Sequence, residues 1–167
     1  MNKKSKIILI TLFILIILVS RIAVAEQLDD SQSDYFSLQT SLTTNHWDND
    51  PDTNNVQELV GLEYHPDSNQ LYGLAYFKNS AFQSSWYFYK GKIYSWKEIN
   101  DFELYGKMTY GVITGYDDEG GRYEAVWYEL GTFPAVLPSV GIGYKHLSLE
   151  LSLFANQGFM VHGGIKF

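Results

Sequence analysis

The chain ends on the stretch Gly158-Phe159-Met160-Val161-His162-Gly163-Gly164-Ile165-Lys166-Phe167. In a β-strand, side chains two positions apart lie on the same face. One face of this stretch would carry Phe159, Val161, Gly163, Ile165 and the terminal Phe167, and the other Met160, His162, Gly164 and Lys166. The alternation predicts a final β-strand with one apolar face. Because strands of soluble sheets alternate in the same way, the start of the chain is needed to tell the two settings apart.

Residues 1–25 have the three parts of a secretory signal peptide. Three lysines lie within the first six residues, residues 7–19 are almost wholly apolar, and Ala23-Val24-Ala25 supplies a small-x-small cleavage pattern. An uncleaved membrane anchor is the alternative, but Arg21 limits the apolar run to fewer than the roughly 18 residues that a spanning helix needs. We therefore expect residues 1–25 to be removed and residues 26–167 to form one domain, which could insert into a membrane only through strands.

The composition agrees with a barrel that crosses a membrane. The chain holds 13 Tyr, 10 Phe and 4 Trp with 19% charged residues, and aromatic girdles at the two bilayer interfaces would account for so many rings. The signal contains four basic residues and no acid, so its removal changes the formal net charge from −7 to −11. Such an acidic surface argues against binding nucleic acid. The chain has no cysteine, so strand pairing must hold the fold together without disulfides.

Eight segments of the mature chain have the pattern of strands. In the clearest of them, four leucines alternate with polar residues from Leu147 to Leu153. Eight is the smallest strand number of a bacterial outer-membrane barrel, and an aromatic C-terminus is typical of its closing strand. We therefore predict an all-β fold, an eight-stranded antiparallel transmembrane β-barrel in the bacterial outer membrane. A soluble lipocalin-like barrel is the alternative, and it would turn the leucines inward. The predicted strands are residues 35–43, 57–64, 71–79, 84–94, 102–116, 138–144, 147–154 and 158–167.

The lengths of the connections predict which residues lie outside the cell. If the first strand starts in the periplasm, the three periplasmic turns are short and two of the four outer loops are long, as in bacterial barrels. His46 and Asn79-Ser80 then lie together at the outer rim. The predicted turns are residues 65–70, 95–101 and 145–146, and the predicted outer loops are 44–56, 80–83, 117–137 and 155–157.

Two stretches of the chain resemble a known family. The first is Leu71-Tyr72-Gly73-Leu74-Ala75-Tyr76-Phe77-Lys78-Asn79-Ser80, and the second is Phe133-Pro134-Ala135-Val136-Leu137-Pro138-Ser139-Val140-Gly141-Ile142-Gly143-Tyr144. Together with the closing strand, they are similar to the outer-membrane lipid A palmitoyltransferase family, in which a Lys-Asp-Ser run ends the third strand. The similarity is loose and covers most of residues 71–167. A group of small outer-membrane proteins shares a further pattern, which corresponds here to His46, Gly61-Leu62-Glu63-Tyr64 and Asn79-Ser80.

This resemblance implies the transfer of an acyl chain between phospholipid and lipid A, with catalytic roles for His46, Asn79 and Ser80. His46 would act as a base toward a lipid hydroxyl, and Ser80 or Asn79 would donate a hydrogen bond to the oxyanion. Asn79 departs from the family's aspartate, because an amide can orient a histidine but cannot balance its positive charge. His46 also lies closer to Asn79 in sequence than the family's spacing would place it. The implied partners are phospholipid, lipopolysaccharide and the outer-membrane bilayer.

The lumen should distinguish this enzyme from its main alternative, a non-catalytic outer-membrane barrel with a structural, adhesion or envelope-protection role. In the enzyme, small residues such as Gly73, Ala75 and Gly106 would leave a slot for one acyl chain. Pro134 and Pro138 lack the backbone N–H, and they would open a gap in the strand pairing through which lipid enters. In the non-catalytic barrel, charges would fill the lumen in pairs, drawn from Lys78, Lys107, Glu63 and Glu150.

The sequence predicts neither a metal nor a cofactor. Asp48, Asp50 and Asp52 alternate as calcium ligands do, but Thr53 stands where such a loop needs glycine and Leu59 where it needs glutamate. Zinc spacings, phosphate loops and dinucleotide fingerprints are missing from the sequence. We expect the acids to keep the loops soluble, with weak divalent bridging to lipopolysaccharide phosphates as the alternative, and we expect a monomer.

Overall fold

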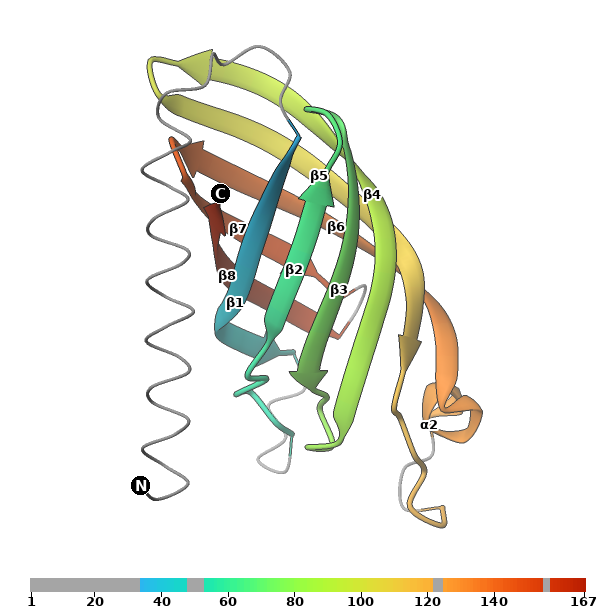
Figure 1. The fold of residues 1–167 in the computed structure, drawn as a ribbon. Helices are drawn as coiled ribbons and strands as arrows, with labels where there is room; N and C mark the ends of the chain where they lie inside the picture. Colours follow the sequence, from blue (N-terminus) through green and yellow to red (C-terminus); the bar gives the residue numbers. More distant parts are fainter. Residues whose placement is uncertain (1–33, 48–52, 122–124, 155–156) are drawn as a thin grey trace, which may run out of the picture. The chain divides into compact units, whose positions relative to one another are not determined.

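Eight antiparallel strands follow one another around a closed barrel, and β1 pairs with β8 to close it (Figure 1). The computed structural model describes residues 34–47, 53–121, 125–154 and 157–167, so the predicted signal peptide lies outside the described residues. The predicted all-β barrel of eight antiparallel strands is confirmed. Its strands are β1 (Tyr35–His46), β2 (Val60–His65), β3 (Gln70–Lys78), β4 (Ser84–Ile99), β5 (Phe102–Thr114), β6 (Thr132–Tyr144), β7 (Leu147–Leu153) and β8 (Gly158–Lys166).

The two ends of the barrel differ in their connections. At the turn end, residues 66–69, 100–101 and 145–146 join neighbouring strands. At the loop end, longer connections follow β1, β3 and β5, whereas the one after β7 is as short as the turn at residues 66–69. The connection after β5 contains the short helix α2 (Val126–Leu130), drawn at the bottom of Figure 1. In the described part of the chain, every helix is too short or too polar to cross a bilayer.

Strand β6 differs most from its prediction, because it begins at Thr132 and contains both Pro134 and Pro138. It pairs with β5 along its whole length. Its ladder with β7, in contrast, starts only at Ser139, opposite Ser152. Residues 132–138 therefore form a strand edge without a described partner on the β7 side, and proline is tolerated at such an edge because it has no donor to lose.

The β4–β5 hairpin is also longer than predicted. Pairing continues to Ile99 and Phe102, so the turn between these strands contains only residues 100–101. The residues of this extension, which include Ser95, Trp96 and Lys97, have too few consecutive apolar positions to read as a strand. They are ordered here because β5 supplies a partner for each backbone segment, apart from a register shift between Ser95 and Lys97.

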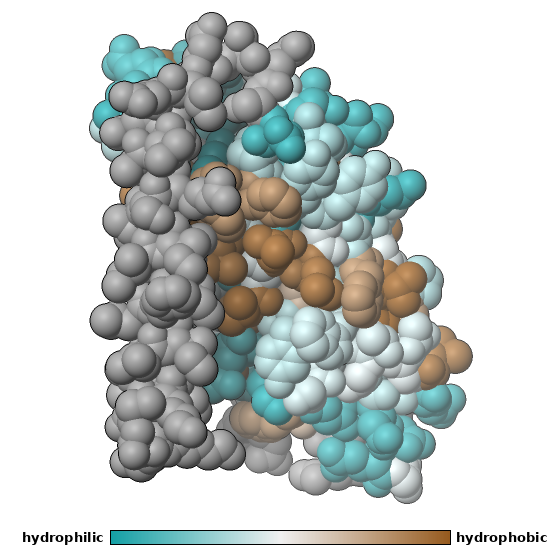
Figure 2. Space-filling view, in the orientation of Figure 1, coloured by the Kyte–Doolittle hydropathy of each residue, from teal (hydrophilic) through white to brown (hydrophobic). Residues whose placement is uncertain are grey.

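Apolar side chains cover the outside of the barrel. Leu62, Leu74, Phe88 and Val112 are all exposed there, and Figure 2 shows apolar residues in a band across the visible face, with hydrophilic residues toward both ends. Outward aromatic pairs lie on each side of this band. They are Phe36–Tyr64 and Phe102–Tyr144 at the turn end and Tyr76–Trp86 and Trp47–Phe159 at the loop end.

The inside of the barrel is largely polar. Buried inward positions include Gln39, Glu63, Lys107 and Glu150, whereas Leu147, Leu149 and Leu153 of β7 are exposed on the outer face. The same period-two alternation holds in β8, where Met160 and His162 are buried and Ile165 is exposed. This arrangement is the reverse of that in a lipocalin-like barrel, in which the leucines would face inward.

Candidate functional site

A cavity of about 320 Å³ occupies the loop-end half of the lumen. Its volume falls in the range of about 300–1,000 Å³ that is typical of ligand pockets. Half of its lining residues come from β3, β4, β5 and β6, and most of these are apolar or aromatic. They include Ala75, Phe77, Tyr87, Ile113, Ala135 and Leu137.

His46 and Ser80, two of the three predicted site residues, both line this cavity. His46 is the last residue of β1 rather than a loop residue, and it is 8% exposed. Its Nδ1 lies 2.9 Å from Oδ1 of Asn55. The Nδ2 of Asn55 donates to the carbonyl of Thr53, 3.5 Å away, so the amide oxygen is the atom turned toward His46. The structure thus places Asn55 next to the ring of His46.

The third predicted residue, Asn79, holds the loop between β3 and β4. It is completely buried. Its Oδ1 accepts the backbone N–H groups of Ala81 at 2.9 Å and Gln83 at 3.0 Å, and its Nδ2 donates to Oε1 of Gln83 at 3.0 Å. Asparagine commonly stabilises turns in this way. Asn79 therefore contributes to the site by fixing the backbone on which Ser80 stands.

Ser80 is held from two sides. Its Oγ lies 2.8 Å from the hydroxyl of Tyr128 in α2, and its carbonyl accepts the backbone N–H of Asn54 at 2.8 Å. The consecutive residues Asn54 and Asn55 thus connect the loop of Ser80 to the ring of His46. The ring of Tyr116 is tilted against the ring of Tyr128, and their centroids lie 5.0 Å apart. Burial raises the pKa of Tyr116 above its ordinary range, so this hydroxyl stays protonated at the cavity mouth.

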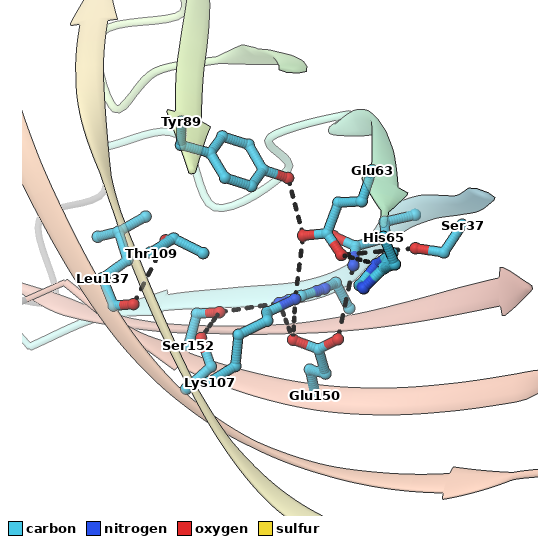
Figure 3. A network of polar contacts seen from close by, with 12 residues as sticks. Ser37, Glu63, His65, Tyr89, Lys107, Thr109, Leu137, Glu150 and Ser152 are labelled. Atoms are coloured by element: carbon cyan, nitrogen blue, oxygen red, sulfur yellow. Dashed lines mark hydrogen bonds and ion pairs between the residues drawn. The ribbon is translucent and has the colours of Figure 1, made fainter. Parts of the chain in front are cut away.

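A charged cluster forms the floor of the cavity (Figure 3). The Nζ of Lys107 lies 3.1 Å from Oε1 of Glu63 and also pairs with Oε2 of Glu150. The hydroxyl of Tyr89 donates to Glu63 and that of Tyr105 to Glu150, each at 3.0 Å. Three of the four charges expected in the lumen of a non-catalytic barrel are therefore present and paired. The fourth, Lys78, instead donates to Ser84 in an exposed contact.

Only one of the three small residues expected to form an acyl slot lies in the cavity wall. Ala75 lines the cavity. Gly73 does not leave space, because the ring of Tyr89 occupies the position where a Cβ would stand. Gly106 is covered by the indole of Trp96, on the outward side of β5. The features expected for an enzyme and for a non-catalytic barrel therefore occur together, because the paired charges lie at the floor of the cavity.

The cavity reaches the edge of β6 that lacks a described partner. Its lining residues include Pro134 and Val136, which alternate with the inward Phe133, Ala135 and Leu137. Val136 is 60% exposed. Outward residues of this strand edge thus also line the cavity. The entrance for lipid that Pro134 and Pro138 suggest stays a prediction.

Sequence reasoning missed Asn55 and Tyr128. Asn55 lies in a polar loop where an asparagine normally indicates only a turn, and Tyr128 belongs to a five-residue helix that is too short to produce a periodic pattern. Within the described residues, no group of three or more His, Asp or Glu side chains is placed to hold a metal ion. The aspartates considered as calcium ligands, Asp48, Asp50 and Asp52, lie outside those residues.

Comparisons with known proteins show the fold of the chain but no family. No protein-family model and no curated protein matches the chain. A de novo designed transmembrane β-barrel superposes with a TM-score of 0.51 at 15% sequence identity, covering 80% of this chain and 95% of its own. The N-terminal β-barrel domain of Pseudomonas aeruginosa OprF gives a TM-score of 0.45 at 9% identity, covering 81% and 98%. The similarity to the designed barrel shows that the chain has the fold of a transmembrane β-barrel. These comparisons do not single out the lipid A palmitoyltransferase family.

Proposed function

We propose that the protein is an outer-membrane barrel that binds an acyl chain in its loop-end cavity and transfers it between phospholipid and lipid A. The bilayer setting is supported by the apolar outer face and its flanking aromatic pairs, which are typical of outer-membrane barrels. The loop end would face outward, because long loops of such barrels lie outside the cell.

The observation that carries the proposal is the lining of the cavity. An apolar chamber that also presents an imidazole and a serine hydroxyl can hold a hydrocarbon chain with its ester next to both groups. Because the amide oxygen of Asn55 can only accept a hydrogen bond, it keeps the proton of His46 on Nδ1 and leaves Nε2 free to act as a base.

The transfer would proceed in two steps. Nε2 of His46 takes the proton of a lipid A hydroxyl while its oxygen attacks the ester carbon of the phospholipid. Ser80 donates a hydrogen bond to the oxyanion that forms. The tetrahedral intermediate then collapses, the ester C–O bond breaks, and the proton passes from His46 to the departing lysophospholipid oxygen. The products are acylated lipid A and lysophospholipid, and no external reductant or oxidant is needed.

The edge of β6 that has no partner among the described residues supports a route for the lipid. An acyl chain in the outer leaflet could enter sideways past Pro134 and Val136, whereas passage through the loops would expose it to water. Entry between β6 and β7 leaves the ester at the rim, on the same side of the barrel lumen as the cavity mouth.

A second function is favoured by one observation, the cluster of Glu63, Lys107 and Glu150. Charges paired across a lumen are the feature expected of a non-catalytic barrel with an envelope role. This function would require that the cavity near His46 take no part in lipid chemistry.

Mass spectrometry of lipid A and phospholipids would decide between these functions. Separate cultures would express the intact protein and the site variants His46→Ala and Ser80→Ala. His146→Ala and Ser68→Ala, at the turn end, would be the matched controls. Acyl transfer predicts an additional chain on lipid A and an equal gain of lysophospholipid, lost in the two site variants and kept in the two controls. Identical lipid profiles from all five proteins, each verified in the outer membrane, would refute acyl transfer and favour the envelope role.

A further inference from the structure

The lumen contains a second cavity at its turn end, and the lining of this cavity differs from that of the loop-end cavity. This turn-end cavity has a volume of about 380 Å³. Its lining is polar and includes Ser37, His65, Glu103 and Lys166. Glu63 lines both cavities, Lys107 lines the loop-end cavity, and Glu150 lines the turn-end cavity. The charged cluster therefore lies between a largely apolar cavity and a more polar one.

This boundary, which we call the septum, consists of Glu63, Tyr89, Tyr105, Lys107 and Glu150. The three charged residues are 1–4% exposed, and they come from β2, β5 and β7, so their contacts join strands on different sides of the barrel. Figure 3 shows Lys107 pointing between the two carboxylates, with Tyr89 reaching toward Glu63.

The two tyrosines of the septum have matching surroundings. Tyr89 lies over Gly73 of β3, and Tyr105 lies over Gly141 of β6. At each glycine, the aromatic ring takes the place of the missing side chain. Each ring thus packs against the backbone of a glycine while its hydroxyl donates to a glutamate, to Glu63 from Tyr89 and to Glu150 from Tyr105.

Two imidazoles support the carboxylates. Nε2 of His65 lies 3.1 Å from Oε2 of Glu63, and Nε2 of His162 lies 2.8 Å from Oγ of Ser152 and 3.8 Å from Oε2 of Glu150. Separating a buried ion pair exposes charges in a medium of low dielectric constant, which is strongly unfavourable. An ion that crosses the lumen would have to separate Lys107 from at least one glutamate.

We propose that the septum seals the barrel against ions, so that the protein keeps the membrane impermeable and its loop-end cavity is a blind pocket rather than one half of a pore. This function is independent of acyl transfer. It requires only that the two chambers do not communicate, whatever the loop-end cavity binds.

Conductance across planar lipid bilayers tests the proposal on the full barrel. The wild-type protein should give no steady current steps. Lys107→Met leaves two carboxylates in the lumen and should produce a cation-selective current. The double variant Glu63→Gln/Glu150→Gln leaves the ammonium and should produce an anion-selective current. Lys145→Met, which removes an exposed lysine in a turn, is the control and should remain closed.

The sign of the reversal potential in a salt gradient makes the result specific to the septum. Opposite signs for the two lumen variants support it, because a leak around a damaged barrel would have the same selectivity in both. A steady current through the wild-type protein would overturn the proposal without any variant. It would also be overturned if both variants, shown to be folded by their resistance to protease in vesicles, were as closed as the wild type.

Discussion

The Nδ1 atom of His46 lies 2.9 Å from Oδ1 of Asn55, an asparagine nine residues further along the chain. An amide oxygen accepts hydrogen bonds and cannot donate them, so this contact selects the tautomer of His46 with the proton on Nδ1. The same asparagine follows Asn54, whose backbone N–H binds the carbonyl of Ser80. One short segment of the loop after β1 therefore sets the position of both groups proposed to act on the ester.

Asn55 provides a test of this arrangement. Asn55→Leu should lower the rate of acyl transfer by about 10²-fold, because the ring of His46 loses its orienting partner. Asn55→Asp should restore most of the rate, since a carboxylate can accept the same proton and also balance an imidazolium. The measurement is the initial rate of lipid A acylation in detergent micelles with purified phospholipid.

Recovery of the rate in Asn55→Asp would show that Asn55 acts by orienting the ring of His46, and not by a general effect on the loop. Val56→Ala, next to Asn55 and exposed on the same loop, is the matched control and should keep the full rate. Equal losses in Asn55→Leu and Asn55→Asp would show that Asn55 does not orient His46.

The space around Ala75 provides a second test. Ala75→Phe should fill the loop-end cavity, while Val112→Phe adds the same kind of ring on the outer face, where Val112 is 44% exposed. Binding of a fluorescent fatty acid should weaken about tenfold, or by ~1.4 kcal/mol, in Ala75→Phe and stay unchanged in Val112→Phe. Fluorescence titration of the two variants in the same detergent measures the difference. Equal affinities would show that the chain binds elsewhere.

Most of the fold could be predicted from the sequence because most strands have an alternating pattern of their own. The alternation of Leu147 to Leu153 with polar residues needs no knowledge of the rest of the chain, and the structure has β7 at the predicted place. The first half of β6 could not be predicted, because Pro134 and Pro138 normally argue against a strand interior. They are accommodated by the long β5, a partner that no local pattern of β6 reveals.

The position of the candidate site at one rim of the barrel could also be predicted from the sequence. His46 and Ser80 were placed at one rim by counting strands, and they do line the same cavity. The partner of His46 depends on how the loop after β1 folds back, and such a contact leaves no periodic trace in the sequence. Gly73 was misread for the same reason, since the ring that covers it comes from Tyr89 on the neighbouring strand.

Gly73 and Gly61 offer a matched pair for stability. In Gly73→Ala the new methyl group would overlap the ring of Tyr89, and overpacking of this kind typically costs about 1–3 kcal/mol. In Gly61→Ala the nearest atom is Cβ of Ala75 at 3.5 Å, which is an ordinary contact. Urea unfolding in lipid vesicles should show a clear loss for Gly73→Ala and little for Gly61→Ala. Equal stabilities would mean that Tyr89 does not pack on Gly73.

Lys107 should be critical for stability only while both glutamates are charged. Lys107→Met leaves Glu63 and Glu150 buried without their cation, and breaking a buried pair in this way typically costs about 3–5 kcal/mol. The triple variant Glu63→Gln/Lys107→Met/Glu150→Gln removes all three charges and should recover most of that loss. The free energy of unfolding in vesicles, measured for both variants, shows whether the triple variant is more stable than Lys107→Met. A triple variant that is less stable than the single one would contradict it.

The turn between β2 and β3 should make stability depend on pH through Asp67. The backbone N–H groups of Asn69 and Gln70 each donate to Oδ1 of Asp67 at 2.8 Å, and the side chain of Gln70 donates to Oδ2. These hydrogen bonds, that from Asn69 first, lower the pKa of Asp67 below its ordinary value of 3.8. A carboxyl whose pKa is lower in the folded state stabilises the fold above its ordinary pKa and loses that contribution as the pH falls through the lowered value.

Asp67→Asn should therefore lose stability relative to the wild type near neutral pH, and the gap should narrow as the pH falls below about 4. Urea unfolding of both proteins in vesicles at several pH values measures this gap. Gln70→Ala is the intermediate control, because it removes one side-chain donor and leaves both backbone donors in place. A gap that stays constant down to the most acidic condition would show that the hydrogen bonds to Asp67 do not distinguish its charged form from its neutral form.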